Sequence, residues 1–380
     1  MLKLIVLSIS IMLLSPPVIN GILPEIRDSL ALTQAQSELI TTIPSIACLF
    51  AILLSNVAVK KIGIRWIIFI GLMLVGLGGV LPVIADSFML VLVGRIVLGL
   101  GLGLYSPLAI DLINILFAES ERAKLMGYRS AIEQMGQSLM SLLAGLLAVF
   151  SWNASFLVYG FAFLLAILFL VLVPEINLGN AFDENKTKEK ERLPFIVYPI
   201  VLLAVVVVLT GAAIGIRFPA LAVEVMGDGY NSSLFFVLKP IIGICAGFFF
   251  GKLHRILGRK LLYIGLACLG IASFLIGFSN GNFSILVVGF LLSSLVPAWI
   301  FPFIFMLISK RTVGLARKFS MSLILFALHA TVFIMTPVVV GIEQIVGSSD
   351  LVAPYPVLGS LVFVVLAFII VFGERTVQRN

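Results

Sequence analysis

Long apolar runs without charged residues alternate along the chain with short polar segments. A helix needs about 20 apolar residues to cross a bilayer, and a single spanning run satisfies its own backbone there only as a helix. The pattern therefore predicts an all-α membrane protein with twelve transmembrane helices. The predicted spans are 4–24, 39–59, 66–85, 88–117, two within 134–173 that break at Ser151-Trp152-Asn153, 196–216, 230–251, 261–279, 283–309, 319–342 and 351–373.

Basic residues gather in every second loop of this pattern. Lys and Arg are enriched in cytoplasmic loops, so the alternation predicts a multi-pass protein of the cytoplasmic membrane with both termini in the cytoplasm. Acidic residues, Glu38 and Glu343 among them, fall in the predicted outer loops. Of the 25 basic residues, those outside the inner segments are Arg27, in an outer loop, and Arg95, Arg217 and Lys239, within spans.

The composition also indicates that lipid is the main solvent. Hydrophobic residues make up 61% of the chain and charged residues only 11%, whereas soluble domains carry about 25% charged residues. The formal charge of +7 does not indicate nucleic-acid binding, because the basic residues form short clusters between apolar runs. The three cysteines lie inside apolar runs, which argues against a disulfide framework.

The chain divides into two similar halves. A hydrophilic segment of mixed charge at 174–193 is predicted to be a flexible cytoplasmic linker between six-helix halves at 1–173 and 194–380. The halves repeat at an offset of 195 residues without a gap, and such a parallel repeat is one way in which transporters are built. The matched positions are Pro24 and Pro219, Gly63 and Gly258, Arg65 and Lys260, Gly94 and Gly289, Pro107 and Pro302, and Arg122 and Arg317.

A loop motif occurs at the same place in both halves. The segment from Gly251 to Lys260 resembles the G-x-L-A-D-R-x-G-R-K/R loop of the major facilitator superfamily. The first-half copy, Asn56 to Arg65, is degraded and has Lys60 where the family usually has Asp. The resemblance implies a tight glycine turn and a conformational latch made by Gly63, Arg65, Gly251, Arg255, Gly258 and Arg259.

Two further segments extend the resemblance over the whole chain. Residues 94–101, with Arg95, resemble the R-x-x-x-G motif of the fourth helix, and residues 151–156 resemble the W-R-x-x-F motif at the start of the sixth. The glycines at 99 and 103 are predicted to let helices approach closely. The Gly-Pro pair of drug/proton antiporters is missing from residues 136–145. The resemblance implies twelve helices in two pseudo-symmetric halves.

Charged side chains inside spans are candidates for proton coupling. An ionisable group in the bilayer costs about 2.5–3.5 kcal/mol on insertion scales and is a functional candidate by default. We predict that Glu133 is the titrating carboxylate and that Arg95 and Asp111 assist it. Simpler alternatives are a helix pair of Glu133 with Arg129, a structural pair for Arg95, and pairing of Asp111 with Arg65 or Arg129.

Substrate-binding candidates come from the predicted cavity helices. In-span cations outnumber in-span acids by three to two, which favours an anionic or neutral polar solute. Arg217 could instead extend to the membrane surface. The candidates are Asn20, Tyr105, Arg217, Lys239, Trp299 and His329.

These features together predict a monomeric secondary active transporter that works by alternating access with protons, a small organic solute and the bilayer as its partners. No nucleophile–base arrangement, metal cluster or phosphate loop occurs in the sequence, so we expect neither an enzyme nor a cofactor. A multidrug efflux pump is the alternative within the class. A non-transporting membrane sensor is the alternative of another class, and it would normally need a soluble signalling domain.

Overall fold

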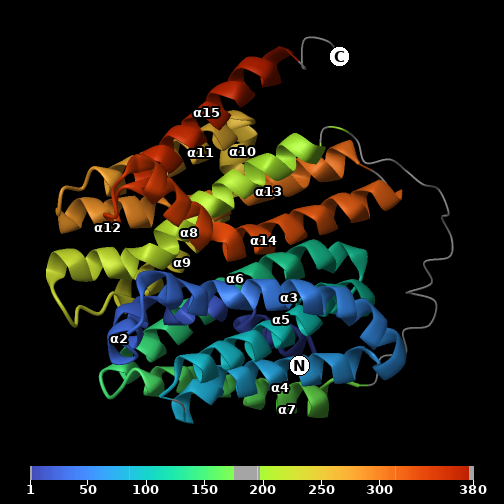
Figure 1. Cartoon of the computed structure of the whole chain (residues 1–380). Coiled ribbons are helices and arrows are strands. Elements are labelled where there is room, and N and C mark those ends of the chain that lie inside the picture. Colours follow the sequence, from blue (N-terminus) through green and yellow to red (C-terminus); the bar gives the residue numbers. More distant parts are fainter. Residues whose placement is uncertain (1, 85, 175–194, 196, 313, 376–380) are drawn as a thin grey trace. The chain divides into compact units, whose positions relative to one another are not determined.

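The computed structural model describes residues 2–84, 86–174, 195, 197–312 and 314–375, and this part of the chain is helical throughout (Figure 1). Contact clustering divides it into two compact units. The first unit is Met1–Lys188 with Asn231–Ile241, and the second is Glu189–Tyr230 with Ile242–Asn380. The predicted linker at 174–193 lies outside the described residues except for Pro174.

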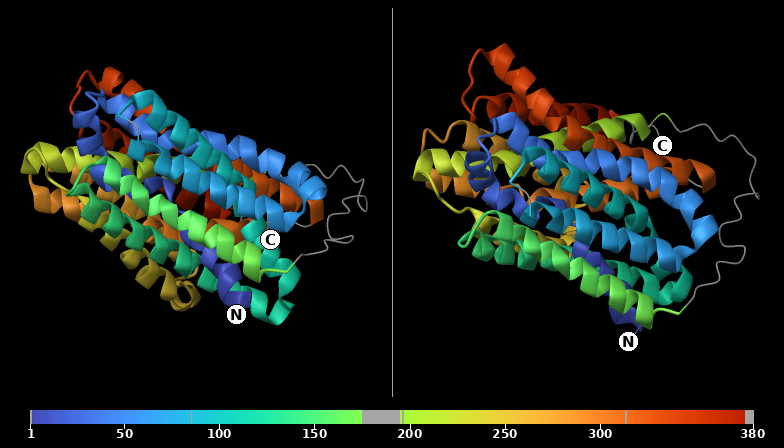
Figure 2. Two further views of the ribbon diagram at one scale, coloured as in Figure 1. Left: turned by 90° about the horizontal axis from the view of Figure 1, so that it is seen from below. Right: turned by 60° about the horizontal axis from the view of Figure 1, so that its bottom comes forward.

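The first unit consists of α1 (Leu2–Ser8), η1 (Ile9–Met12), η2 (Pro16–Ile22), α2 (Leu23–Ser29), α3 (Gln34–Ile62), α4 (Ile64–Val80), η3 (Leu81–Ile84), α5 (Phe88–Leu116), α6 (Glu119–Ala148), η4 (Asn153–Gly160) and α7 (Phe161–Leu172). The N-terminal pieces, dark blue in Figure 2, lie beside α7. Helix α3 begins with a capping box, in which Thr33 and Gln36 each accept a hydrogen bond from the other's backbone N–H.

The second unit is built from α8 (Val197–Met226), α9 (Ser233–Phe248), α10 (Phe250–Leu257), α11 (Lys260–Gly277), α12 (Phe283–Leu292), α13 (Leu295–Arg311), α14 (Gly314–Val346) and α15 (Pro354–Arg375). The first turns of α9, up to Ile241, cluster with the first unit. Within their own units, α4 packs against α5 and α7, and α11 packs against α12, α13 and α15.

Nine helices in the described residues are long and apolar enough to cross a membrane, or eleven if each bent pair is one span. One bent pair is Lys3–Met12 with Pro16–Ser29, at 45°, and the other is Ser233–Phe248 with Phe250–Leu257, at 52°. Pro16 and Pro17 supply no N–H donors, which accounts for the break in the first span. The fifth predicted span is the C-terminal half of α6, whose polar side chains keep it outside this group.

Close glycine contacts hold α5 between α3 and α4. A Cβ on Gly99 would lie 2.4 Å from the Pro44 carbonyl oxygen, and one on Gly103 would lie 2.2 Å from the Cys48 carbonyl oxygen, both on α3. On the other side of α5, a Cβ on Gly101 would lie 2.5 Å from the Gly71 oxygen of α4. The predicted role of the glycines at 99 and 103 in close helix approach is confirmed.

Equivalent positions of the two halves also have equivalent local geometry. Gly63 and Gly258, which are 195 residues apart, both have positive φ, 90° and 53°, and each ends a helix. Gly94 approaches Gly78 of α4, and Gly289 approaches Ala272 of α11. Because positive φ and close approach both favour glycine, the repeat in the sequence reflects a repeat in backbone shape.

Candidate functional site

Arg95 on α5 is fully buried at the break in the first span. Its Nε donates to the Ile40 oxygen at 2.9 Å, Nη2 to the Pro16 oxygen at 2.5 Å, and Nη1 to the Tyr159 hydroxyl at 3.0 Å. The Tyr159 hydroxyl in turn donates to the Ser15 oxygen at 3.0 Å. Arg95 and Tyr159 thus supply donors to two carbonyls beside the proline break and join α3, α5, η2 and η4.

An ion pair lies inside α6. Arg129 Nη2 is 2.5 Å from Glu133 Oε1, and the two side chains are only 16% and 14% exposed. The atoms are close but poorly aligned, so Oε1 accepts no hydrogen bond, and Arg129 Nε also has no partner among the described residues. This is the helix pair that the sequence analysis gave as the simpler alternative to proton coupling at Glu133. The described contacts do not bring Glu133 and Arg95 together.

Tyr105 on α5 lies near this pair. Its side chain is 0% exposed, and its hydroxyl has no hydrogen-bond partner among the described residues. The hydroxyl is close enough to interact electrostatically with Glu133 and Arg129. A buried hydroxyl without a partner costs free energy, so this group is a candidate for contact with a bound molecule. Asp111, the third predicted proton-coupling residue, is half-buried six residues further along α5.

The other predicted binding residues divide between the two units. Asn20, on η2, is buried, and its Oδ1 has no partner among the described residues. Lys239, half-buried on α9, belongs to the segment that clusters with the first unit. In the second unit, Trp299 Nε1 donates to the Ala246 oxygen at 3.2 Å, and His329 is half-buried on α14.

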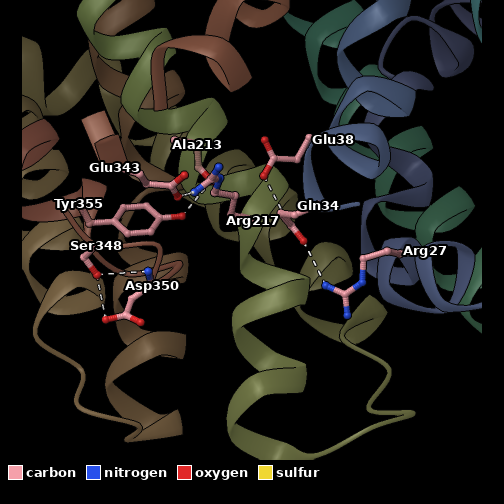
Figure 3. A network of polar contacts seen from close by, with 9 residues as sticks. All are labelled: Arg27, Gln34, Glu38, Ala213, Arg217, Glu343, Ser348, Asp350 and Tyr355. Carbon is pink, nitrogen blue, oxygen red and sulfur yellow. Dashed lines mark hydrogen bonds and ion pairs between the residues drawn. The ribbon is translucent and has the colours of Figure 1, made fainter. Parts of the chain in front are cut away.

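Arg217 corrects part of the charge argument made from the sequence. It is 1% exposed and pairs with Glu343, as Figure 3 shows, whereas the sequence suggested a solute contact or extension to the surface. Glu343 was placed in an outer loop, but α14 continues to Val346 and carries it. A buried cation is costly unless an acid or several hydrogen-bond acceptors surround it. The count of three in-span cations against two acids therefore omitted one acid.

The latch motif forms a turn in each unit, with one difference from the prediction. The second copy is not a loop from Gly251 onward, because Gly251 lies inside α10 and the turn falls at Gly258. In the first unit, Arg65 Nη2 donates to the Leu170 oxygen in the last turn of α7, where a cation also complements the helix dipole. Arg255 and Arg259 are exposed.

Sequence reasoning missed Tyr159 and a contact at the start of α9. In the first unit, Ser232 Oγ donates to the Gly21 oxygen at 3.1 Å, and Asn231 Nδ2 donates to the Gly145 oxygen at 3.3 Å. Side chains on Gly21 or Gly145 would overlap Ser233. The polar run of residues 231–233 before an apolar helix was a usable signal.

The sequence profile of the Major Facilitator Superfamily matches residues 5–316. The chain belongs to the Major Facilitator Superfamily. The members of this family are multi-pass membrane transporters and not enzymes. The xylose transporter XylE from E. coli, in an inward open conformation, has a TM-score of 0.74 at 16% identity, with 97% of this chain and 94% of that chain covered. At this identity the likeness shows the shared fold.

Two proteins of Bacillus subtilis (strain 168) are similar to parts of this facilitator. A hexuronate transporter is 29% identical over 134 residues, which are 35% of this chain and 32% of the relative. A bacillibactin exporter is 27% identical over 153 residues, which are 38% of each protein. The matched part thus spans only 32% and 38% of the two relatives' lengths.

Proposed function

We propose that this facilitator is a proton-coupled secondary transporter of a small anionic or neutral polar solute. It works by alternating access as a monomer in the cytoplasmic membrane, with both termini in the cytoplasm. The observation that carries the proposal is the Arg129–Glu133 pair, mostly buried within α6 and in electrostatic range of the Tyr105 hydroxyl, which has no hydrogen-bond partner among the described residues. A carboxylate in such a place is costly to ionise, so proton binding at Glu133 is the change that a gradient can drive.

The test is proton-driven accumulation in proteoliposomes. Purified protein is reconstituted, a pH gradient is imposed, and labelled sugars, sugar acids and other small metabolites are offered one at a time. Glu133→Gln should abolish accumulation but preserve exchange of internal for external solute. Accumulation in this variant that still follows the pH gradient would remove Glu133 from the mechanism. The orientation of the gradient that drives accumulation gives the direction of transport.

A multidrug efflux pump is the second candidate. It is favoured by one observation, the similarity of part of the chain to an exporter. The Arg129–Glu133 pair inside α6 is compatible with both candidates. The identity of the transported solute distinguishes them. A lipophilic cation that drives proton release from the vesicles, in place of a polar solute, would establish this alternative.

A further inference from the structure

The Arg129 guanidinium uses only part of the edge that it presents to Glu133. Nε and Nη2 lie on the same edge of a guanidinium and together match the two oxygens of a carboxylate. Here Nη2 faces Glu133 Oε1 at 2.5 Å, whereas Nε has no hydrogen-bond partner among the described residues. Glu133 therefore lies close to only one of the two donor nitrogens that together could bind a carboxylate.

A second unsatisfied donor lies nearby on another helix. The Tyr105 hydroxyl of α5 is completely buried, has no partner among the described residues, and interacts electrostatically with both Arg129 and Glu133. The packing of α4 on α5 fixes its ring, because a Cβ on Gly71 would lie 3.0 Å from Tyr105 Cβ. Arg129 and Glu133 keep 16% and 14% of their side-chain surface, but Arg129 Nε, Glu133 Oε1 and the Tyr105 hydroxyl are themselves buried, so a ligand reaches these donors only if the site opens.

We propose that Arg129 and Tyr105 form a binding site for a carboxylate, and that this site opens when Glu133 takes up a proton. The proposal rests on proton coupling at Glu133 and names the substrate class, an organic monocarboxylate. The proton binds a Glu133 oxygen and ends the ion pair, which frees Nε and Nη2 together. The solute carboxylate then accepts from both nitrogens and from the Tyr105 hydroxyl.

Charge balance links the two ligands at this site. Empty, the site holds Arg129 and ionised Glu133 and is neutral. With both a proton and a monocarboxylate it is again neutral. With the proton alone it is positive, and with the anion alone negative, and an uncompensated charge in the membrane is costly. The empty and the doubly loaded forms are therefore those that reorient, so one proton moves with each carboxylate.

Two of the charged groups on the neighbouring elements of the first unit are engaged with other partners. Lys3 on α1 pairs with Glu121 at 2.6 Å, and Arg95 holds Tyr159. Tyr105 on α5 interacts electrostatically with Glu133, and Cys48 of α3 with Tyr105. In this unit α6 packs against α1, α5, η1, η2, η4 and the start of α9, where Ser138 of α6 donates to the Val237 oxygen. The charged or titratable residues of these elements are Lys3, Arg95, Tyr105, Asp111, Tyr159 and Lys239.

Binding experiments on the full-length protein in detergent test the site. Ligand-induced thermal stabilisation is measured with glucuronate, galacturonate, gluconate and lactate, and with the neutral sugars glucose and galactose. We expect at least one carboxylate to stabilise the protein, more strongly in mildly acidic than in mildly alkaline buffer. Stabilisation by neutral sugars alone, or by none of the carboxylates, would overturn the assignment.

Variants test separately the protonation of Glu133, the hydroxyl of Tyr105 and the guanidinium of Arg129. Glu133→Gln should bind the carboxylate equally well in both buffers, and about tenfold more tightly than wild type in the alkaline one. Tyr105→Phe should weaken binding about tenfold, whereas a purely structural hydroxyl would leave affinity unchanged. Arg129→Gln combined with Glu133→Gln removes both charges, so the fold is preserved while carboxylate binding is lost. Glu121→Gln, in the exposed pair on the same helix, should change none of these properties.

The net charge moved in each transport cycle is a property that a merely structural ion pair would not determine, and it can be measured. Uptake of the bound carboxylate into potassium-loaded proteoliposomes should be the same with and without a valinomycin-imposed potential. A response to that potential would overturn the charge balance. Proton-driven uptake of a neutral solute without any carboxylate binding would sink this inference and leave the proposed function standing. Carboxylate binding without proton-coupled movement would overturn the proposed function and, with it, the opening of this site by a proton on Glu133.

Discussion

Arg217 on α8 and Glu343 on α14 form an ion pair that joins two helices 126 residues apart in the chain. Arg217 is almost completely buried, and Glu343 lies in the last turn of α14. In the same region of the second unit, the Tyr355 hydroxyl donates to the Ala213 oxygen at 3.0 Å (Figure 3). The first helix of this unit is thus tied to both α14 and α15 by polar contacts.

Breaking this pair on one side should destabilise the protein strongly. Arg217→Met leaves Glu343 without its partner, and loss of one member of a buried pair costs about 3–5 kcal/mol. Thermal unfolding in detergent measures the effect. The double variant Arg217→Met with Glu343→Leu should recover most of the loss. An equal loss in both variants would show that packing, and not charge, is the cause.

The exposed pair of Lys3 and Glu121 provides the matched control for that experiment. Its side chains are 50% and 47% exposed, and such pairs contribute about 0–1 kcal/mol. Lys3→Met should therefore leave the unfolding temperature almost unchanged. A large effect would assign this pair a role beyond ordinary surface electrostatics.

Arg95 should prove irreplaceable by lysine. The planar guanidinium of Arg95 reaches the Ile40 oxygen, the Pro16 oxygen and the Tyr159 hydroxyl together, and the compact ammonium of a lysine cannot. Arg95→Lys should therefore lower both stability and transport. Tyr159→Phe removes a hydroxyl that accepts from Arg95 and donates to the Ser15 oxygen, and should cost about 1–3 kcal/mol because buried groups lose their partner. Tyr198→Phe, at a ring that is 53% exposed, is the control and should be neutral. Wild-type stability in Arg95→Lys would show that these three contacts of Arg95 do not stabilise the protein.

Gly103→Ala should prevent α3 and α5 from packing. The added Cβ would lie 2.2 Å from the Cys48 oxygen, and backbone cannot yield as a flexible side chain does. We expect little folded protein in membranes, judged by size-exclusion chromatography of the detergent extract. Gly127→Ala on α6 meets nothing within 4 Å and should fold normally, because alanine is favoured over glycine in a helix by about 1 kcal/mol.

Thiol labelling in intact cells checks the orientation. In a cysteine-free background, a cysteine within 183–192 should be protected from an impermeant thiol reagent, and one at the exposed residue Ser349 should react. The positive-inside pattern is the physical reason. Permeabilised cells, in which both should react, provide the control. Reaction of the 183–192 cysteine from outside would reverse the topology.

The sequence by itself determined the membrane class, most of the spans and the family. Apolar length is a local property, and a run of the required length has no other stable state in lipid than a helix. The paired turns at Gly63 and Gly258 were equally readable, because positive φ favours glycine whatever surrounds it. Helix α6 was predicted from its uncharged half, although its polar half lowers its overall apolar character.

Tertiary structure alone decided what each buried charge contacts. Arg95 reaches Pro16 and Tyr159 across 79 and 64 residues, and no spacing rule links such positions. Arg217 pairs with Glu343 because α14 continues beyond the apolar run from which the span was predicted. The pair of Arg129 and Glu133 could be foreseen from helical spacing, but the unused Tyr105 hydroxyl beside it could not. Burial makes such partners obligatory, and the packing of distant helices selects which groups they are.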